Sequence, residues 1–290
     1  MTRREFTSVL GAVSLAAAEP SFPTVCVFSK HMAQFGYDEL GKRAKDIGFQ
    51  GIDLTVRPKG HVLPERAAQD LPRAVEAIRT HGLTVPMITT DIKSAADPNA
   101  KAILSGAGKL KIPYWKVGYH TYTRDDIEAE IAKVREAVTG IVALSKEYGV
   151  TAGWHNHSGN YFGSAVWDTR AVIHDYDPKW IGYYFDPGHA TIEGGLAGWR
   201  IAQNMVMPRI KMVAIKDFYW EKAADGKWKN RWCPMGEGMV DWERVFAGFA
   251  AAKFPGPYSL HLEYQAPDEL AAMARDLEYV RKRLAVAYGV

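Results

Sequence analysis

The chain has 290 residues, a length that suits one large domain or two small ones. Its hydrophobic fraction of 47% allows a substantial core, and its net charge of +3 is small. No basic stretch is dense enough to indicate a nucleic acid or an anionic membrane as a partner, so we expect neither. The two cysteines, Cys26 and Cys233, do not make a disulfide framework, and we expect both to be free thiols.

The first residues have the pattern of an export signal. Arg3-Arg4-Glu5-Phe6 precedes a short apolar run and then Ala16-Ala17-Ala18. A charged region, an apolar region and a small-residue cleavage site in this order are typical of a secretory signal, and paired arginines before Phe resemble a twin-arginine signal. We predict an export signal over residues 1–18, a catalytic domain over 19–290 and a periplasmic location. A frayed N-terminal helix is the alternative.

Apolar, strand-like runs then alternate with amphipathic helical patterns. In the first half of the chain, the strands are expected over residues 24–28, 51–56, 84–89 and 114–118. One helix is expected over 38–47, ending at Gly48, which tolerates the left-handed backbone of a helix end. A second helix carries Leu71, Val75 and Ile78 on one face.

The second half continues the alternation. A long helix, with Ile127 at its start, ends at Tyr148-Gly149, and a last helix is expected over 267–287. The segment from Phe218 to Gly238 contains an Asp-Gly turn signal, which predicts a β-hairpin. Its tryptophans are expected either over the active-site mouth or packed on the rim. Strands are expected over residues 150–155, 180–185, 210–215 and 258–262.

Eight strand–helix alternations without a low-complexity linker predict a single (β/α)8 TIM barrel. A doubly wound open sheet is the structural alternative. Such a sheet usually carries a Gly-rich phosphate loop after its first strand. Here the first strand leads into Phe28-Ser29-Lys30-His31, which contains no glycine. The barrel is therefore favoured.

Polar residues gather where the predicted strands end. In a barrel of this kind, the carboxyl ends of the strands share one cleft, which holds the active site. Six of the nine histidines fall at these ends or in the loops just after them, whereas random placement would scatter them. The polar residues in chain order are Lys30, His31, Arg57, Lys59, His61, Thr90, Asp91, Tyr119, His120, His155, Asn156, His157, Asp186, His189, Lys216, Asp217 and Glu263.

Asp186-x-x-His189 and Glu263 are the most informative of these residues. Two carboxylates and an imidazole suit a divalent ion such as Mn²⁺, Zn²⁺ or Co²⁺. The same groups also suit a hydrogen-bonded cluster that grips a neutral sugar. Both readings place these three residues at the centre of the site.

The sequence resembles the sugar phosphate isomerase/epimerase family, part of the xylose-isomerase-like TIM barrel superfamily. The resemblance covers roughly residues 24–285. It is specific for the superfamily and poorly specific for the substrate. The matching segments are His155-Asn156-His157, Phe185-Asp186-Pro187-Gly188-His189, Ile215-Lys216-Asp217, Gly236-Glu237-Gly238 with Asp241, and Leu262-Glu263.

The resemblance implies a metal bound by Glu, Asp, His and Glu from the last four strands. Asp186 and Glu263 match this set directly. His155 stands where the family has its first Glu, and Ala214 stands where it has its His. The expected metal ligands are thus Asp186, Glu263, His155 and His189, with the replacement at Ala214 leaving the metal uncertain.

The departure from the family set also affects the catalytic groups. The family's epimerases use two glutamates as acid and base, and only Glu263 of that pair is present here. Glu263 is the expected base, and His155 could be the second acid/base, because its reference pKa of about 6.5 lies near working pH. Alternatively, His155 binds the metal and His189 or His157 completes the shell. In a third arrangement, Lys216 fills the vacated position and the site works without metal.

The family chemistry is removal of a proton next to a carbonyl. The enediolate that forms carries negative charge, which Lys216 or a metal would stabilise. Residues expected to bind the sugar line the predicted mouth. They are His61, Arg57, His120, His157, Lys116 and Trp220.

Several functions remain open on the sequence. A sugar or keto-sugar isomerase or epimerase leads. A lyase or dehydratase, of the inosose-dehydratase or 3-keto-glycoside-cleaving kind, shares the same intermediate, and a carbohydrate-binding barrel without activity is a third class. A nuclease is disfavoured because Ala214 breaks the ligand set that it needs. The sequence leaves a homo-oligomer possible.

Overall fold

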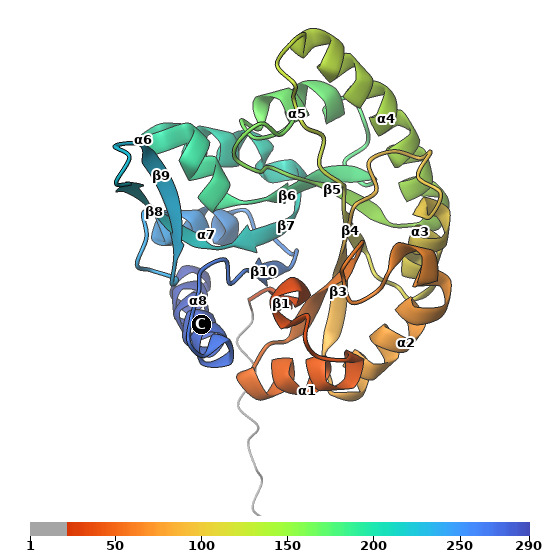
Figure 1. The fold of residues 1–290 in the computed structure, drawn as a ribbon, viewed down its shortest axis with the longest axis horizontal. Coiled ribbons are helices and arrows are strands. Elements are labelled where there is room, and N and C mark those ends of the chain that lie inside the picture. Colours follow the sequence, from red (N-terminus) through yellow and green to blue (C-terminus); the bar gives the residue numbers. More distant parts are fainter. Residues whose placement is uncertain (1–21) are drawn as a thin grey trace, which may run out of the picture.

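A computed structural model describes residues 22–290, which form the closed barrel that the sequence predicts (Figure 1). The predicted export signal lies outside these residues. Eight parallel strands close in the order β1-β10-β7-β6-β5-β4-β3-β2. They are β1 (Val25–Phe28), β2 (Gly51–Val56), β3 (Thr84–Thr90), β4 (Tyr114–Lys116), β5 (Thr151–His155), β6 (Ile181–Phe185), β7 (Ile210–Ile215) and β10 (Tyr258–Leu260).

Helices surround the strands on the outside of the barrel (Figure 1). Among residues 22–290, no helix is long and apolar enough to cross a membrane. The α-helices are α1 (Tyr37–Ile47), α2 (Ala67–Thr80), α3 (Ala100–Lys109), α4 (Ile127–Tyr148), α5 (Trp167–Ile173), α6 (Pro187–Val206), α7 (Trp242–Ala251) and α8 (Glu269–Tyr288). Short 3-10 helices are η1 (Ser29–Met32), η2 (Pro64–Arg66) and η3 (Met207–Arg209).

The helix ends follow from local chemistry. Gly48 and Gly149 end α1 and α4 in the left-handed conformation, as expected of residues without a Cβ. Asp126 begins α4, and its side chain accepts a hydrogen bond from the backbone N–H of Ala129. α6 is broken at Gly195, whose φ of 55° and ψ of −139° no helix contains. These stops set where each chain segment returns to the barrel.

The predicted hairpin is present. It consists of β8 (Asp217–Lys222) and β9 (Trp228–Cys233), paired antiparallel, and it turns at Gly226 with a φ of 77°. The pair stands outside the barrel sheet, beside α6 (Figure 1). Both cysteines, Cys26 and Cys233, are free and buried. The hairpin extends the wall of the barrel mouth next to β7.

The interior of the barrel is partly polar. Met87, Tyr184, Met212 and Ala214 form an apolar cluster of their own inside the strands. Just beside it, the buried carboxylate of Asp53 accepts hydrogen bonds from three hydroxyl groups on other strands. The donors are Thr89 at 2.7 Å, Ser259 at 2.8 Å and Tyr184 at 3.1 Å. This network ties four strands together beneath the mouth.

Candidate active site

A pocket opens where the barrel strands end. It has a volume of about 130 Å³. Four of its side chains are cationic and only one is a carboxylate. The lining residues are Phe28, Lys30, Arg57, Thr89, Lys116, Tyr119, His155, His157, Tyr184, Lys216, His261 and Glu263. Such a lining suits a small ligand on which negative charge develops.

Asp186 is the best-fixed residue of the site. It follows β6, and its Oδ1 accepts a hydrogen bond from the backbone N–H of His189 at 2.9 Å, which caps α6. Asn156, at the end of β5, clamps the Asp186 backbone from both sides: its amide donates to the carbonyl oxygen, and its oxygen accepts from the N–H. One carboxylate oxygen is thereby used for structure, and Oδ2 is free for the site.

Three basic groups converge on Asp186 Oδ2. Lys216 Nζ lies 3.1 Å away, His155 Nε2 3.3 Å away and His189 Nε2 3.9 Å away. Burial acts to raise the pKa of Asp186, but the Lys216 ammonium and the two imidazoles outweigh it and hold this pKa well below its usual value. Asp186 is therefore a permanent carboxylate at neutral pH, and Lys216 is its counter-ion.

His155 is held at both ring nitrogens. Tyr119 Oη lies 2.7 Å from its Nδ1, and its Nε2 is hydrogen-bonded to Asp186 Oδ2 at 3.3 Å. Burial and the charge of Lys216 lower the pKa of His155 well below its usual value, against the opposing effect of Asp186. The neighbouring His157 packs on His189 with ring centroids 3.9 Å apart, and burial lowers its pKa to about 4. The imidazoles are thus neutral in this part of the site.

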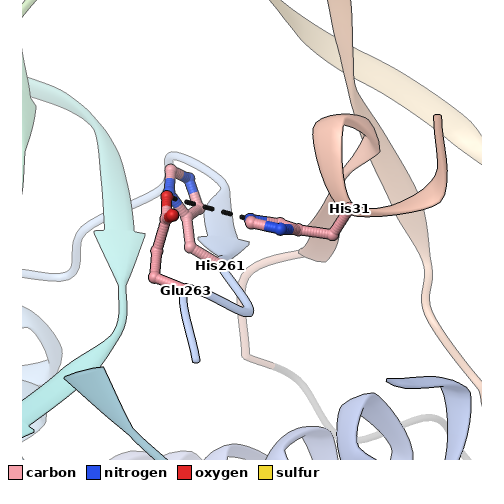
Figure 2. A group of neighbouring side chains, drawn as sticks. All are labelled: His31, His261 and Glu263. Atoms are coloured by element: carbon pink, nitrogen blue, oxygen red, sulfur yellow. Dashed lines mark ion pairs between the residues drawn. The ribbon is translucent and has the colours of Figure 1, made fainter. Parts of the chain in front are cut away.

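Glu263 lies across the pocket from this group. Its Oε2 accepts a hydrogen bond from Lys30 Nζ at 2.9 Å. Its Oε1 faces two imidazoles, His31 Nε2 at 3.9 Å and His261 Nδ1 at 3.8 Å (Figure 2). Burial acts to raise the pKa of Glu263, but His261 and the ammonium groups of Lys216 and Lys30 hold it well below its usual range. Glu263 is therefore ionised in the free site.

Lys116 is a buried amine in the pocket wall at the end of β4. It is 1% exposed, and its Nζ lies 3.3 Å from the centre of the Tyr119 ring. Within residues 22–290, no carboxylate oxygen lies within 4 Å of this nitrogen, and burial together with Arg57 lowers its pKa to about 7. Lys116 therefore exchanges a proton readily near neutral pH.

The expected substrate-binding residues are only partly brought together. Arg57, His157 and Lys116 line the pocket, whereas His61, His120 and Trp220 do not. His120 donates its Nε2–H to the Lys93 carbonyl oxygen and stacks on Trp154, and His61 contacts Thr55. The hairpin tryptophan that lies near Lys216 and His189 is Trp232, not Trp220. The ring of Trp232 lies 4.9 Å from Lys216 Nζ and 5.1 Å from the His189 ring.

The Gly236-Glu237-Gly238 motif has a structural explanation in Asp217. The Asp217 carboxylate accepts hydrogen bonds from the backbone N–H groups of Gly236, Gly238 and Val240, and from Trp242 Nε1 at 3.0 Å. A Cβ at position 238 would overlap with that carboxylate, so only glycine allows the approach. Asp217 fixes the loop that leads into α7 and lies outside the pocket lining.

The metal set implied by the family resemblance does not come together. His155, Asp186 and His189 form one group of neighbouring ligand atoms, and Glu263 belongs to another. The Lys216 ammonium already occupies Asp186 Oδ2. Ala214 is buried in the barrel floor and offers no ligand atom. A cation shared by Asp186 and Glu263 therefore does not fit this arrangement.

Sequence reasoning missed several pocket residues. The strand predicted over 258–262 includes His261, whereas β10 ends at Leu260 and His261 faces the mouth. Its i, i+2 spacing to Glu263 was the available signal, because alternate residues of an extended chain share one face. Tyr184 and Thr89 carried no such signal, since both lie inside predicted strands. The missed lining residues also include Phe28 and Tyr119, the latter noted only as a strand end.

Comparison with known proteins identifies the family of the chain. The model of the family described as xylose isomerase-like TIM barrel matches residues 42–283. No curated protein matches the chain in sequence.

Solved structures with the same fold share little sequence with this chain. A 3-keto-D-glucoside 4-epimerase from E. coli superposes with a TM-score of 0.72 at 15% identity, over 90% of this chain and 100% of that one. An L-ribulose 3-epimerase superposes with a TM-score of 0.67 at 16% sequence identity, over 92% of this chain and 96% of that one. A xylose isomerase-like TIM barrel protein from Mycobacterium smegmatis in complex with magnesium superposes with a TM-score of 0.66 at 18% sequence identity, over 91% of this chain and 97% of that one. With the family model matched across most of its length, the chain belongs to the xylose isomerase-like TIM barrel family.

Proposed function

We propose that this protein is a sugar isomerase or epimerase that moves a proton at the carbon next to a carbonyl. The observation that carries the proposal is the pocket lining: Lys30, Arg57, Lys116 and Lys216 face a single carboxylate, Glu263. Removing a proton next to a carbonyl creates an enediolate, and preorganised cations stabilise such an anion as it forms. The epimerases among the structural neighbours support this choice of reaction class.

Lys216 is proposed as the electrophile. Its ammonium is buried, lines the pocket and is held by Asp186 at 3.1 Å, so its position is fixed before substrate binds. Trp232 covers it from the hairpin side. A fixed cation in a site with little water stabilises developing negative charge without reorganising. Lys216 thus supplies here the positive charge that a metal would supply.

Glu263 and Lys116 are proposed as the two acid/base groups. Glu263 follows β10 and Lys116 ends β4, and these strands stand four strands apart in either direction around the closed barrel, on opposite sides of the mouth. A base on one side of a planar enediolate and an acid on the other is the arrangement that inverts a carbon centre. Lys116 suits the second role because its pKa of about 7 matches working pH.

His155 is assigned a positioning role. Both of its ring nitrogens are already engaged, one by Tyr119 and one by Asp186. With Nε2–H directed at Asp186, its Nδ1 accepts from the Tyr119 hydroxyl, which holds the ring that packs on Lys116. The second acid/base is therefore placed at Lys116 rather than at His155.

Solvent exchange tests the proposed reaction. The protein is incubated in deuterated buffer with a panel of ketoses and keto sugars, with and without added Mn²⁺ or Zn²⁺, and followed by NMR. Loss of the proton signal at the carbon next to the carbonyl, with product of unchanged carbon skeleton, is the expected result. Elimination products would instead indicate the lyase reaction. Binding without exchange or conversion across the panel would contradict both and leave a carbohydrate-binding barrel.

A further inference from the structure

We propose that His31, His261 and Glu263 form a binding site for one divalent transition-metal ion of the Zn²⁺ type, on the β1–β10 side of the pocket. One nitrogen from each imidazole and one carboxylate oxygen lie within 4.8 Å of one another. These ligands differ from the metal set that the family resemblance implies, which uses Asp186. The metal site does not depend on the proposed reaction.

The three side chains point toward a common centre (Figure 2). Glu263 Oε1 lies 3.9 Å from His31 Nε2 and 3.8 Å from His261 Nδ1. Ligands about 2.0–2.1 Å from a tetrahedral Zn²⁺ stand about 3.4 Å apart. The observed separations exceed this by about half an ångström, which small rotations of the side chains close. The spacing is too long for direct hydrogen bonds and close to that of a coordination shell.

Both imidazole nitrogens lack a partner. His31 Nε2 and His261 Nδ1 are buried, and neither makes a hydrogen bond within residues 22–290. A buried polar atom without a partner has lost its hydration and gained no hydrogen bond in return. Both atoms face the same carboxylate oxygen. A cation between them would satisfy all three atoms at once.

The proton of His261 is placed by the network beneath it. Tyr184 Oη donates to Asp53 Oδ2 at 3.1 Å, so its lone pair is left to accept from His261 Nε2 at 2.9 Å. With its proton on Nε2, His261 presents an unprotonated Nδ1 to Glu263. Histidines that bind metals are oriented in this way by a hydrogen bond at the other ring nitrogen. Asp53 and Tyr184 therefore act as the supporting shell of the site.

The neighbouring lysines leave room for the ion. Lys30 donates a hydrogen bond to Glu263 Oε2, whereas Oε1 is the oxygen that faces the imidazoles. The Lys30 side chain is 45% exposed. Lys216 is committed to Asp186. The other ligand group, around Asp186, has that ammonium on its shared oxygen. The His31 group is therefore the better of the two metal sites. With three protein ligands, one coordination position remains open, as in catalytic zinc sites.

Metal titration tests the proposal directly. Chelator-treated protein is titrated with Zn²⁺ by calorimetry and with Co²⁺ by visible absorption. One equivalent is expected for the wild type. His31→Gln, His261→Gln and Glu263→Gln should each weaken binding by at least about 100-fold, and Tyr184→Phe by about 10- to 100-fold. His155→Gln, in the other ligand group, should keep full affinity.

The opposite results would overturn the site. They are no bound equivalent in the wild type, unchanged affinity in folded His31→Gln, or loss confined to His155→Gln. His31 lies in η1, outside the barrel strands, so His31→Gln carries the test if His261→Gln does not fold, as circular dichroism would show. A wild type that binds one Zn²⁺ but exchanges no sugar proton would support the metal site and contradict the proposed function.

Discussion

Lys216 Nζ lies 3.1 Å from Asp186 Oδ2, and both side chains are almost fully buried. Breaking a buried ion pair leaves one charge without compensation and costs about 3–5 kcal/mol. Lys216→Met should therefore lower the free energy of unfolding by this amount and abolish proton exchange. The double variant Asp186→Asn/Lys216→Met removes both charges of the ion pair, and an Asn at position 186 can still cap α6.

The double variant should accordingly be more stable than Lys216→Met alone, while remaining inactive. Urea unfolding of the wild type, both single variants and the double variant measures the coupling between the two residues. Strictly additive losses would show that the pair does not interact in the folded protein.

Replacing Lys116 should stabilise the protein and inactivate it. The pKa of Lys116 is lowered to about 7 in the folded state against 10.5 for an ordinary lysine, so the unfolded chain binds more protons between these values. The free energy of unfolding therefore rises with pH between these two values. Lys116→Met removes the cost of burying an amine that is protonated in the unfolded chain. The gain should be at most about 4 kcal/mol at pH 7 and about half as large at pH 9.

Urea unfolding at the two pH values checks this expectation, with Val286→Ser, an exposed site at the far end of α8, as a control. A gain that does not change between pH 7 and pH 9 would mean that Lys116 keeps an ordinary pKa. In that case its assignment as the second acid/base would fail, because a lysine of ordinary pKa holds its proton at neutral pH.

The loop after the hairpin should depend on Gly238. A Cβ there would overlap with the Asp217 carboxylate, which accepts hydrogen bonds from three backbone N–H groups of the loop and from the Trp242 side chain of α7. Gly238→Ala should cost more than about 1 kcal/mol of stability. Gly226→Asn is the control for replacing a glycine of the same hairpin region: position 226 has positive φ, which Asn tolerates, and no atom stands in the way of a Cβ there. Equal thermal shifts in the two variants would argue against the steric explanation.

The barrel was predictable because its strands are continuous apolar runs separated by helices with clear ends, such as Gly48 and Gly149. The site was predictable only where a polar residue directly follows a strand, as at Asp186 and Glu263. His261 and Tyr184 could not be separated from strand residues without knowing where β6 and β10 end. The same limit applies to Trp232, because the hairpin register decides which tryptophan faces His189.

The sequence could not predict which polar side chains lie close together. Strand order places β10 and β4 opposite each other, so Glu263 and Lys116 face across the mouth. Asp186 and Glu263, which the sequence treats as one ligand set, fall into two different groups of neighbouring ligand atoms. Side-chain reach decides the rest: Lys216 extends to Asp186, and His120 turns away to Lys93. These contacts depend on three-dimensional packing rather than on local pattern.

The most direct test of the account is the rate of proton exchange in Glu263→Gln. With a keto sugar that the wild type labels in deuterated buffer, Glu263→Gln should exchange the proton about 10²- to 10⁴-fold more slowly. Val286→Ser should match the wild type. Exchange by Glu263→Gln at the wild-type rate would contradict the account, because Glu263 is the only carboxylate lining the pocket among residues 22–290.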